Sequence, residues 1–158
     1  MIRNLSQPFL RSKYDRVYLL IELGDGTFLE FWYDDGHGAD YCTTYSVELH
    51  NSADPAVELV AFLQGKGFAV NSFRELARQT EIQYSFVDET PGRQQDVVCL
   101  HVLADRTTTP IDAGRQDEAR FVSLDNVLSD LGKSVWRPSV LVTGIASLLA
   151  ERDVLGIE

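Results

Sequence analysis

The chain has 158 residues, of which 44% are hydrophobic and 24% are charged, so it is long enough to bury a substantial core and has the composition of a globular domain. Its 14 basic and 24 acidic side chains give a formal net charge of −10 at pH 7. Phosphate backbones are bound by clusters of Lys and Arg, and no basic run is present, so the charge argues against nucleic acid as a partner.

The first predicted elements form a β-hairpin. Residues 16–23 and 27–33 are rich in β-forming side chains, and Gly24-Asp25-Gly26 between them is a turn signal. One face of the second strand would carry Phe28, Glu30 and Trp32, and the other Leu29, Phe31 and Tyr33. Because aromatic side chains fall on both faces, we expect both to be covered. A third strand is predicted over Tyr41 to Leu49.

Two helices are predicted next. Asp54 is a suitable N-cap, and Pro55 suits the first helical position, so a helix should begin there and end at Gly65 or Gly67. The nearly continuous apolar run in this stretch also fits a buried strand, but the capping signal favours a helix. Ser72-Phe73-Arg74-Glu75 then has the form of a capping box, which predicts a second helix to about Ile82.

The second half predicts strands followed by helices. Strands are expected over Gln83 to Val87 and Val97 to Leu103, joined by a turn around Pro91-Gly92. Apolar residues on both faces of the second of these suit a central strand. The remaining predictions are a strand over Ala119 to Ser123, a helix over Leu124 to Leu131 that stops at Gly132, and a last helix opened by Pro138. This order indicates an α+β sandwich.

A segment in the middle of the chain, Arg74-Glu75-Leu76-Ala77-Arg78-Gln79-Thr80-Glu81-Ile82, resembles the end of the Nudix box, which finishes Arg-Glu-aliphatic-x-Glu-Glu-x-Gly-aliphatic. The matching residues are Arg74, Glu75, Leu76 and Ile82. The departures are Arg78 and Gln79 at the two central glutamates, Glu81 at the glycine and, upstream, Val60 at the first glycine and Lys66 at another glutamate. The resemblance is therefore to a divergent, MutT-like Nudix domain with a degenerate box.

The sequence after the box is also similar to the Nudix pattern. In that family a glutamate precedes an aromatic-Val strand and a Leu-Asp-led helix, and here Glu118 precedes Phe121-Val122 and Leu124-Asp125. The resemblance covers about residues 72–131. It implies a Nudix-like α/β/α sandwich around a mixed sheet, and we expect residues 1–158 to form a single domain.

The resemblance also implies a site. Nudix glutamates hold divalent metal ions against a diphosphate, and the metals activate water, so hard oxygen ligands for Mg²⁺ or Mn²⁺ are expected. Glu75 and Glu118 are the implied catalytic residues, and Glu75 and Glu81 the implied metal ligands. Arg74 and Arg78 would bind an anionic small molecule. As an alternative, Glu75 lies where a capping box places a structural carboxylate.

Two other groups of polar residues have simpler interpretations. The segment from Tyr33 to Cys42 brings together three aspartates, a histidine and a thiol, but their order does not match a calcium loop, and Gly with Asp is usual in a loop between strands. Cys99 and His101 share a strand face at a separation too large for a direct hydrogen bond. We interpret them as a buried cysteine and a core histidine whose hydrogen bonds are satisfied.

The two cysteines are far apart and no long apolar run is present, which predicts a cytoplasmic protein with no membrane segment. Two functions remain open. Loss of the paired glutamates favours a non-catalytic ligand-binding or interaction module that needs no metal. The alternative is a divergent hydrolase of a nucleoside diphosphate derivative that uses Mg²⁺ or Mn²⁺. Oligomeric state does not follow from the sequence.

Overall fold

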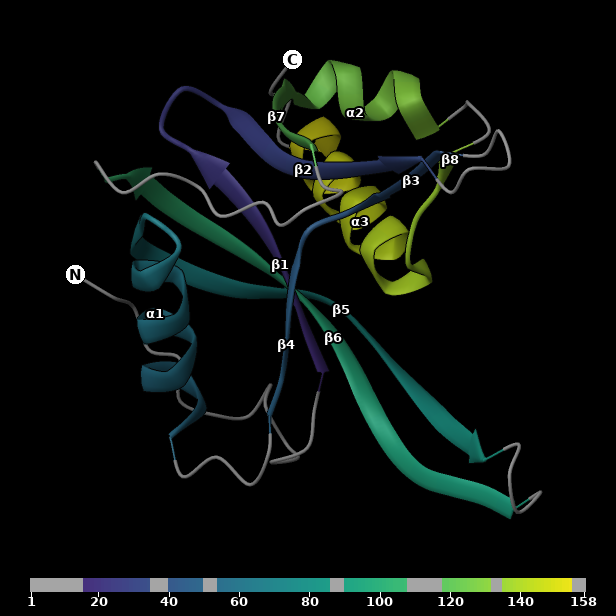
Figure 1. Ribbon diagram of the computed structural model, residues 1–158. Helices are drawn as coiled ribbons and strands as arrows, with labels where there is room; N and C mark the ends of the chain where they lie inside the picture. The colour runs from purple at the N-terminus through teal and green to yellow at the C-terminus, as the bar shows by residue number, and fades with distance from the viewer. Residues whose placement is uncertain are drawn as a thin grey trace.

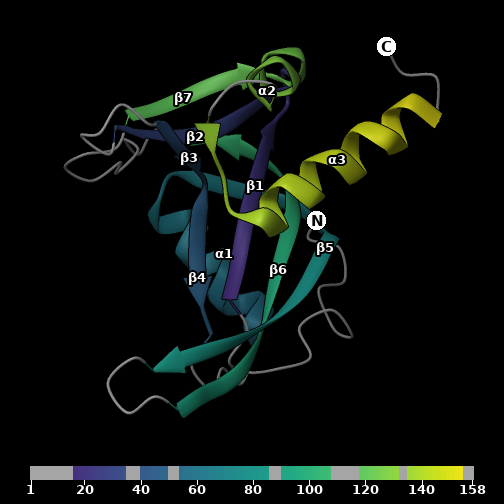
Figure 2. The same cartoon turned by 90° about the vertical axis from the view of Figure 1, so that its right-hand side faces the viewer.

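The computed structural model describes residues 16–34, 40–49, 54–85, 90–107, 118–131 and 135–154. Its strands are β1 (Arg16–Leu23), β2 (Thr27–Asp34), β3 (Asp40–Thr43), β4 (Tyr45–Glu48), β5 (Phe68–Ser85), β6 (Thr90–Arg106), β7 (Glu118–Ser123) and β8 (Val135–Trp136). Its helices are α1 (Pro55–Gly65), α2 (Leu124–Leu131) and α3 (Ser139–Val154). The predicted α/β/α sandwich is confirmed, because α1 covers one face of the sheet and α3 the other (Figures 1 and 2).

The sheet is mixed, as predicted. Its main path runs β5-β6-β1-β2-β3-β8, while β4 pairs with β1 and β7 pairs with β2. Strand β6 lies between β5, to which it is antiparallel, and β1, to which it is parallel. Residues 97–103 therefore lie on an interior strand that is paired on both sides, which agrees with the predicted central strand. The far ends of β5 and β6 extend away from the helices as a long hairpin (Figure 1).

Each face of the central strand contributes to its own hydrophobic core. On the α1 side, Val98, Leu100 and Val102 pack in one cluster with Leu59 and Leu63 of the helix. On the α3 side, the cluster consists of Leu20, Phe28, Ala77, Val97, Cys99, Val127, Val140, Leu141, Ile145 and Leu148. The alternation along β6 thus separates the two layers, as expected for a strand covered on both faces.

Local signals at the first hairpin and at α1 are confirmed. Gly26 has φ 83° and its N–H donates to the carbonyl of Leu23 at 2.9 Å, so the turn uses a conformation that favours glycine. At α1, the Asp54 side chain accepts from the N–H of Val57 at 3.3 Å, as an N-cap does. The predicted strand at 119–123 and the last two helices also agree with β7, α2 and α3.

The predicted helix from Ser72 to Ile82 is wrong, because this stretch lies in β5. Its pairing with β6 contains register shifts between Val70 and Ser72 and between Glu75 and Ala77. These irregularities leave Val70, Phe73 and Ala77 buried, three and four residues apart. That spacing imitates the period of a helix, and long pairing with a central strand overrides the local capping signal.

Two smaller predictions also need correction. The predicted strand from Tyr41 to Leu49 is two strands, β3 and β4, interrupted at Thr44, whose hydroxyl donates to the carbonyl of Leu19 at 2.5 Å. Pro91-Gly92 lies within β6 and is not a turn. Residues 35–39 of the Asp-rich loop lie outside the described residues. In the part of the chain that is described, no helix has the length and apolar character needed to span a membrane.

Candidate functional site

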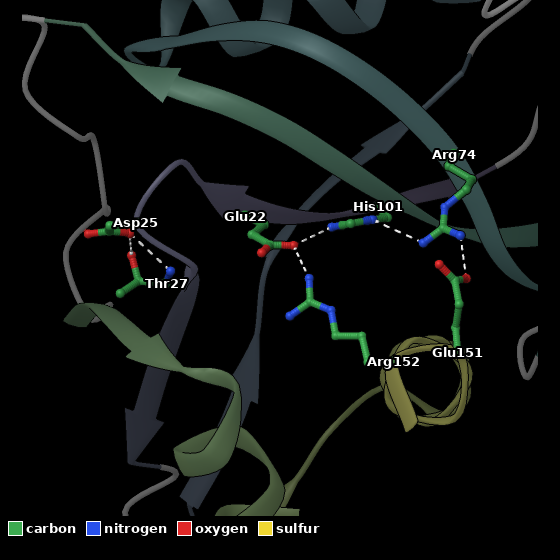
Figure 3. A network of polar contacts seen from close by, with 7 residues as sticks. All are labelled: Glu22, Asp25, Thr27, Arg74, His101, Glu151 and Arg152. Atoms are coloured by element: carbon green, nitrogen blue, oxygen red, sulfur yellow. Dashed lines mark hydrogen bonds and ion pairs between the residues drawn. The ribbon is translucent and has the colours of Figure 1, made fainter. Parts of the chain in front are cut away.

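A polar cavity of about 400 Å³ lies between the C-terminal end of α3 and the adjoining strands β1, β5 and β6. Its polar lining consists of Glu22, Ser72, Arg74, His101, Glu151 and Arg152. Figure 3 shows these residues, apart from Ser72, linked in a continuous chain of contacts. They come from four elements that are far apart in the sequence, β1, β5, β6 and α3, so the tertiary fold, not a local motif, assembles this polar cavity.

His101 is at the centre of the polar cavity. It lies on β6, opposite Arg74 of β5, and its ring is buried. Arg74 Nη2 is 3.3 Å from His101 Nδ1, and an arginine can only donate, so Nδ1 is an acceptor in this contact. The hydrogen of a neutral ring is then on Nε2, which lies 2.8 Å from Glu22 Oε1 and donates to it. These two contacts assign the neutral Nε2–H tautomer.

Glu22 has a second partner on the helix. Arg152 Nη2 lies 2.5 Å from Glu22 Oε1, the oxygen that also accepts from His101. Burial alone would raise the pKa of the Glu22 carboxyl, but the hydrogen bond from His101 and the charge of Arg152 outweigh it. The pKa of Glu22 is therefore lower than its usual value, so the carboxylate is ionised at neutral pH.

Arg74 and Glu151 form the exposed edge of the polar cavity. Their charged groups are in direct contact, and the two side chains remain 45% and 41% exposed. Arg74 thus contacts the buried His101 on one side and the half-exposed Glu151 on the other. Exposed ion pairs contribute little net free energy because water solvates both partners. An incoming anion could therefore replace Glu151 at Arg74 with little loss of stability.

The other predicted residues on β5 do not line the polar cavity. Glu75 accepts from Arg78 at 2.9 and 3.1 Å, and Arg78 also donates to Asp96 of β6 at 2.6 Å. Arg78 therefore has two carboxylate partners, and Glu75 has a cationic one. Glu81 is exposed further along β5. Of the predicted ligand-binding pair, Arg74 alone lines the cavity.

The predicted carboxylates Glu75 and Glu118 are not brought together. Glu75 lies on β5 and Glu118 on β7, and the strand order places β6, β1 and β2 between them. The interpretation of Cys99 and His101 is confirmed: the histidine is paired with Glu22 and Arg74, and burial raises the pKa of the Cys99 thiol to about 12. A thiol of this kind is a poor nucleophile at neutral pH.

The structure also changes the register in which the box can be compared with this chain. The helix that precedes the long hairpin is α1, and Gly67 after it has φ 93°, a conformation that favours glycine, which is the next-to-last residue of the box pattern. In this register the box pattern falls on Val60-Ala61-Phe62-Leu63-Gln64-Gly65-Lys66-Gly67-Phe68. Ala61, Gln64 and Gly65 then take the places of the three glutamates, and Ser52 that of the upstream glutamate. None of these residues can supply a carboxylate to a metal ion.

This chain is similar to known proteins in its three-dimensional structure and not detectably in its sequence. No family model matches the sequence, and no curated protein matches it. A solved ADP compounds hydrolase has a TM-score of 0.61 at 11% identity, with 90% of this chain and 76% of that chain covered. MutT protein from Methanosarcina mazei Go1 has a TM-score of 0.54 at 10% identity, with coverage of 88% and 94%. A NUDIX hydrolase from Nitrosomonas europaea has a TM-score of 0.50 at 13% identity, with coverage of 87% and 89%. The chain therefore has a Nudix-like fold.

Proposed function

We propose that this chain is a non-catalytic ligand-binding module on a Nudix-like scaffold and that its ligand is a small anionic molecule. The observation that carries the proposal is the composition of α1. When Gly67 is aligned with the glycine of the box, the helix has Ala61, Gln64 and Gly65 where the family pattern has glutamates. The residues present do not fit the Mg²⁺ or Mn²⁺ ions that the fold family implies, so no metal-dependent step is part of the proposal.

The remaining carboxylates do not compensate for this loss in the described part of the chain. There, no group of three or more His, Cys, Asp and Glu side chains is arranged to hold a metal ion. Glu75 is paired with Arg78, and Glu118 lies on another part of the sheet. These placements favour the binding module over the divergent hydrolase that the sequence left open.

We assign anion binding to the polar cavity. Arg74, Arg152 and His101 line it, and each of the three contacts a carboxylate of the protein itself, Glu151 at Arg74 and Glu22 at the other two. A phosphate or carboxylate of the ligand would take the place of Glu151 at Arg74, since a guanidinium binds such groups with charge-assisted hydrogen bonds. Glu22 is buried and would stay with His101 and Arg152.

The test is a titration calorimetry experiment with inorganic phosphate and with ADP, each with and without Mg²⁺. We expect binding that does not require the metal and no release of phosphate from ADP. Arg74→Gln should weaken binding about ten- to a hundredfold, which corresponds to the loss of a hydrogen bond between charged groups. Arg78→Gln is the matched control on the same strand and should bind normally.

Two results would count against this function. Metal-dependent hydrolysis of ADP that disappears in Glu75→Gln would establish the divergent hydrolase instead. Equal weakening by Arg74→Gln and Arg78→Gln would place the ligand elsewhere. The cytoplasmic location also remains a proposal; it is consistent with the two free, buried cysteines, Cys42 and Cys99, and cell fractionation would test it.

A further inference from the structure

A second polar group, the Arg137 cluster, lies near the N-terminal end of α3 and consists of Glu30, Trp32, Cys42 and Arg137. Glu30 is on β2 between Phe28 and Trp32, on the face covered by α3, and Cys42 lies opposite Trp32 on β3. Arg137 joins β8 to α3. The side chains of Arg137 and Glu30 are only 1% and 4% exposed. This ion pair is therefore almost completely buried between the sheet and α3.

The ion pair uses only part of its hydrogen-bonding capacity. Glu30 Oε2 accepts from Arg137 Nη2 at 3.0 Å and from the Cys42 thiol at 3.0 Å. Four buried atoms have no hydrogen-bond partner within the described protein: Glu30 Oε1, Trp32 Nε1, Arg137 Nε and Arg137 Nη1. They are all of the described side-chain atoms in this condition, and all belong to one cluster. Because each costs free energy when buried without a partner, their concentration here points to a ligand.

We propose that the Arg137 cluster binds a small, uncharged ring compound that presents a carbonyl oxygen beside an N–H group, as lactams and cyclic imides do. The unpartnered atoms are three nitrogen donors, which carry four N–H bonds between them, and one carboxylate oxygen. A ring carbonyl can accept from Arg137 and Trp32, and the adjacent N–H can donate to Glu30 Oε1. A cyclic imide, with a carbonyl on each side of the N–H, would accept from more of these donors than a lactam with one carbonyl.

The charge of the cluster favours an uncharged ligand over an ion. Glu30 already neutralises Arg137 at Oε2. A ligand carboxylate would lie beside the free oxygen of Glu30, and a ligand cation would lie beside the free N–H groups of Arg137. Either would bury an additional charge without a full counter-charge. The polar cavity differs in this respect, since its outer carboxylate is exposed and replaceable.

The entrance would be at β8. The four atoms are inaccessible in this conformation, so the ligand must enter through a local opening. Strand β8 has only two residues, Val135 and Trp136, and it leads directly into Arg137. Trp136 is 59% exposed and stacks on Tyr41 of β3, with 4.6 Å between the ring centroids. A two-residue pairing at the edge of a sheet opens at low cost compared with the core strands.

The chain contains two tryptophans, Trp32 and Trp136, and both belong to or adjoin this cluster, so intrinsic fluorescence reports on it selectively. Succinimide is the probe, N-methylsuccinimide lacks the N–H that Glu30 would accept, and acetate tests for a carboxylate site. We expect a saturable fluorescence change and a raised melting temperature with succinimide. N-methylsuccinimide should bind at least about tenfold more weakly, because it leaves the buried carboxylate unsatisfied. Acetate should not compete.

The matched variant removes both charges at once. Glu30→Gln combined with Arg137→Met leaves no lone buried charge, keeps both tryptophans and should fold, which circular dichroism would verify. It should lose the succinimide response, whereas Arg74→Gln in the polar cavity should keep it. The proposal is overturned if the folded wild type gives no saturable response. It is also overturned if N-methylsuccinimide or acetate binds as well as succinimide, or if the double variant still responds.

Discussion

The polar cavity and the Arg137 cluster lie on the same face of the sheet, at opposite ends of α3. Their charged groups differ in exposure to solvent and in how many of their polar atoms have partners. In the cavity, the two ring nitrogens of His101 contact Arg74 and Glu22, and Glu22 also accepts from Arg152. Its outer pair, Arg74 and Glu151, is nearly half exposed. In the cluster, the ion pair is almost completely buried and four polar atoms lack partners.

This contrast separates two ways of preparing a protein for a ligand. An exposed pair costs little to break, so a ligand can exchange with one partner while the fold is unaffected. A buried pair with unused donors stabilises the fold only while both partners are present, and a ligand gains by completing its hydrogen bonds. Mutation of the Arg137 cluster should therefore lower stability. Mutation of the exposed pair in the polar cavity should change ligand binding with little loss of stability.

The largest expected effect is at the buried pair. Arg137→Met alone should lower the free energy of unfolding by about 3–5 kcal/mol, because it leaves the Glu30 carboxylate buried without a counter-charge. The double variant with Glu30→Gln should recover much of this loss. Urea denaturation of the single and double variants measures both changes. Equal destabilisation in the two variants would show that packing, and not the lone charge, determines stability here.

A smaller loss is expected where α3 crosses the sheet between the two regions. A Cβ added at Gly144 would lie 2.6 Å from the Cys99 sulfur and 3.1 Å from its Cβ. Gly144→Ala should therefore lower the free energy of unfolding by about 1–3 kcal/mol through overpacking. Cys99→Ala should restore part of it by removing the sulfur. If the second substitution made no difference, the helix must already be free to move away from β6.

The pH dependence of stability should reveal Glu22. Its pKa in the folded protein is below the usual value of 4.5. Its interactions therefore stabilise the fold fully above about pH 4.5, and this stabilisation is lost as the pH falls through the lower, folded-state pKa. The difference in unfolding free energy between the wild type and Glu22→Gln should shrink over that range. A difference that grew towards acid pH would mean that the folded-state pKa is raised instead.

Where the sequence predicted structure correctly, the signal depended on neighbouring residues. The Gly24-Asp25-Gly26 turn and the Asp54 cap are each fixed by contacts within a few positions. The alternation on β6 is also local, and it predicted a central strand. Around Ser72 the local signal failed, because β-bulges in β5 gave buried residues the spacing of a helix. The fold resemblance was correct, although the residues chosen for the box belong to a strand.

The site was predicted only in part, because its contacts join distant positions. Arg74 was among the expected ligand-binding residues, but its partners His101 and Glu151 are 27 and 77 positions away. Arg152 is 130 positions from Glu22. One local signal was present at the other end of α3. Glu30 falls between Phe28 and Trp32 on a strand face that the pattern predicted to be covered, and a charge there requires a partner.

The smallest effect on stability, and the clearest on binding, is expected at the exposed edge of the polar cavity. Arg74→Gln and Glu151→Gln should each change the free energy of unfolding by no more than about 1 kcal/mol, since both side chains are well solvated. Their effects on phosphate binding should be opposite. Arg74→Gln removes the cation that the ligand uses and weakens binding. Glu151→Gln removes the carboxylate that competes with the ligand for Arg74 and strengthens it. Calorimetric titrations of the two variants in parallel measure this difference, and weaker binding in Glu151→Gln would show that the glutamate supports the ligand and does not compete with it.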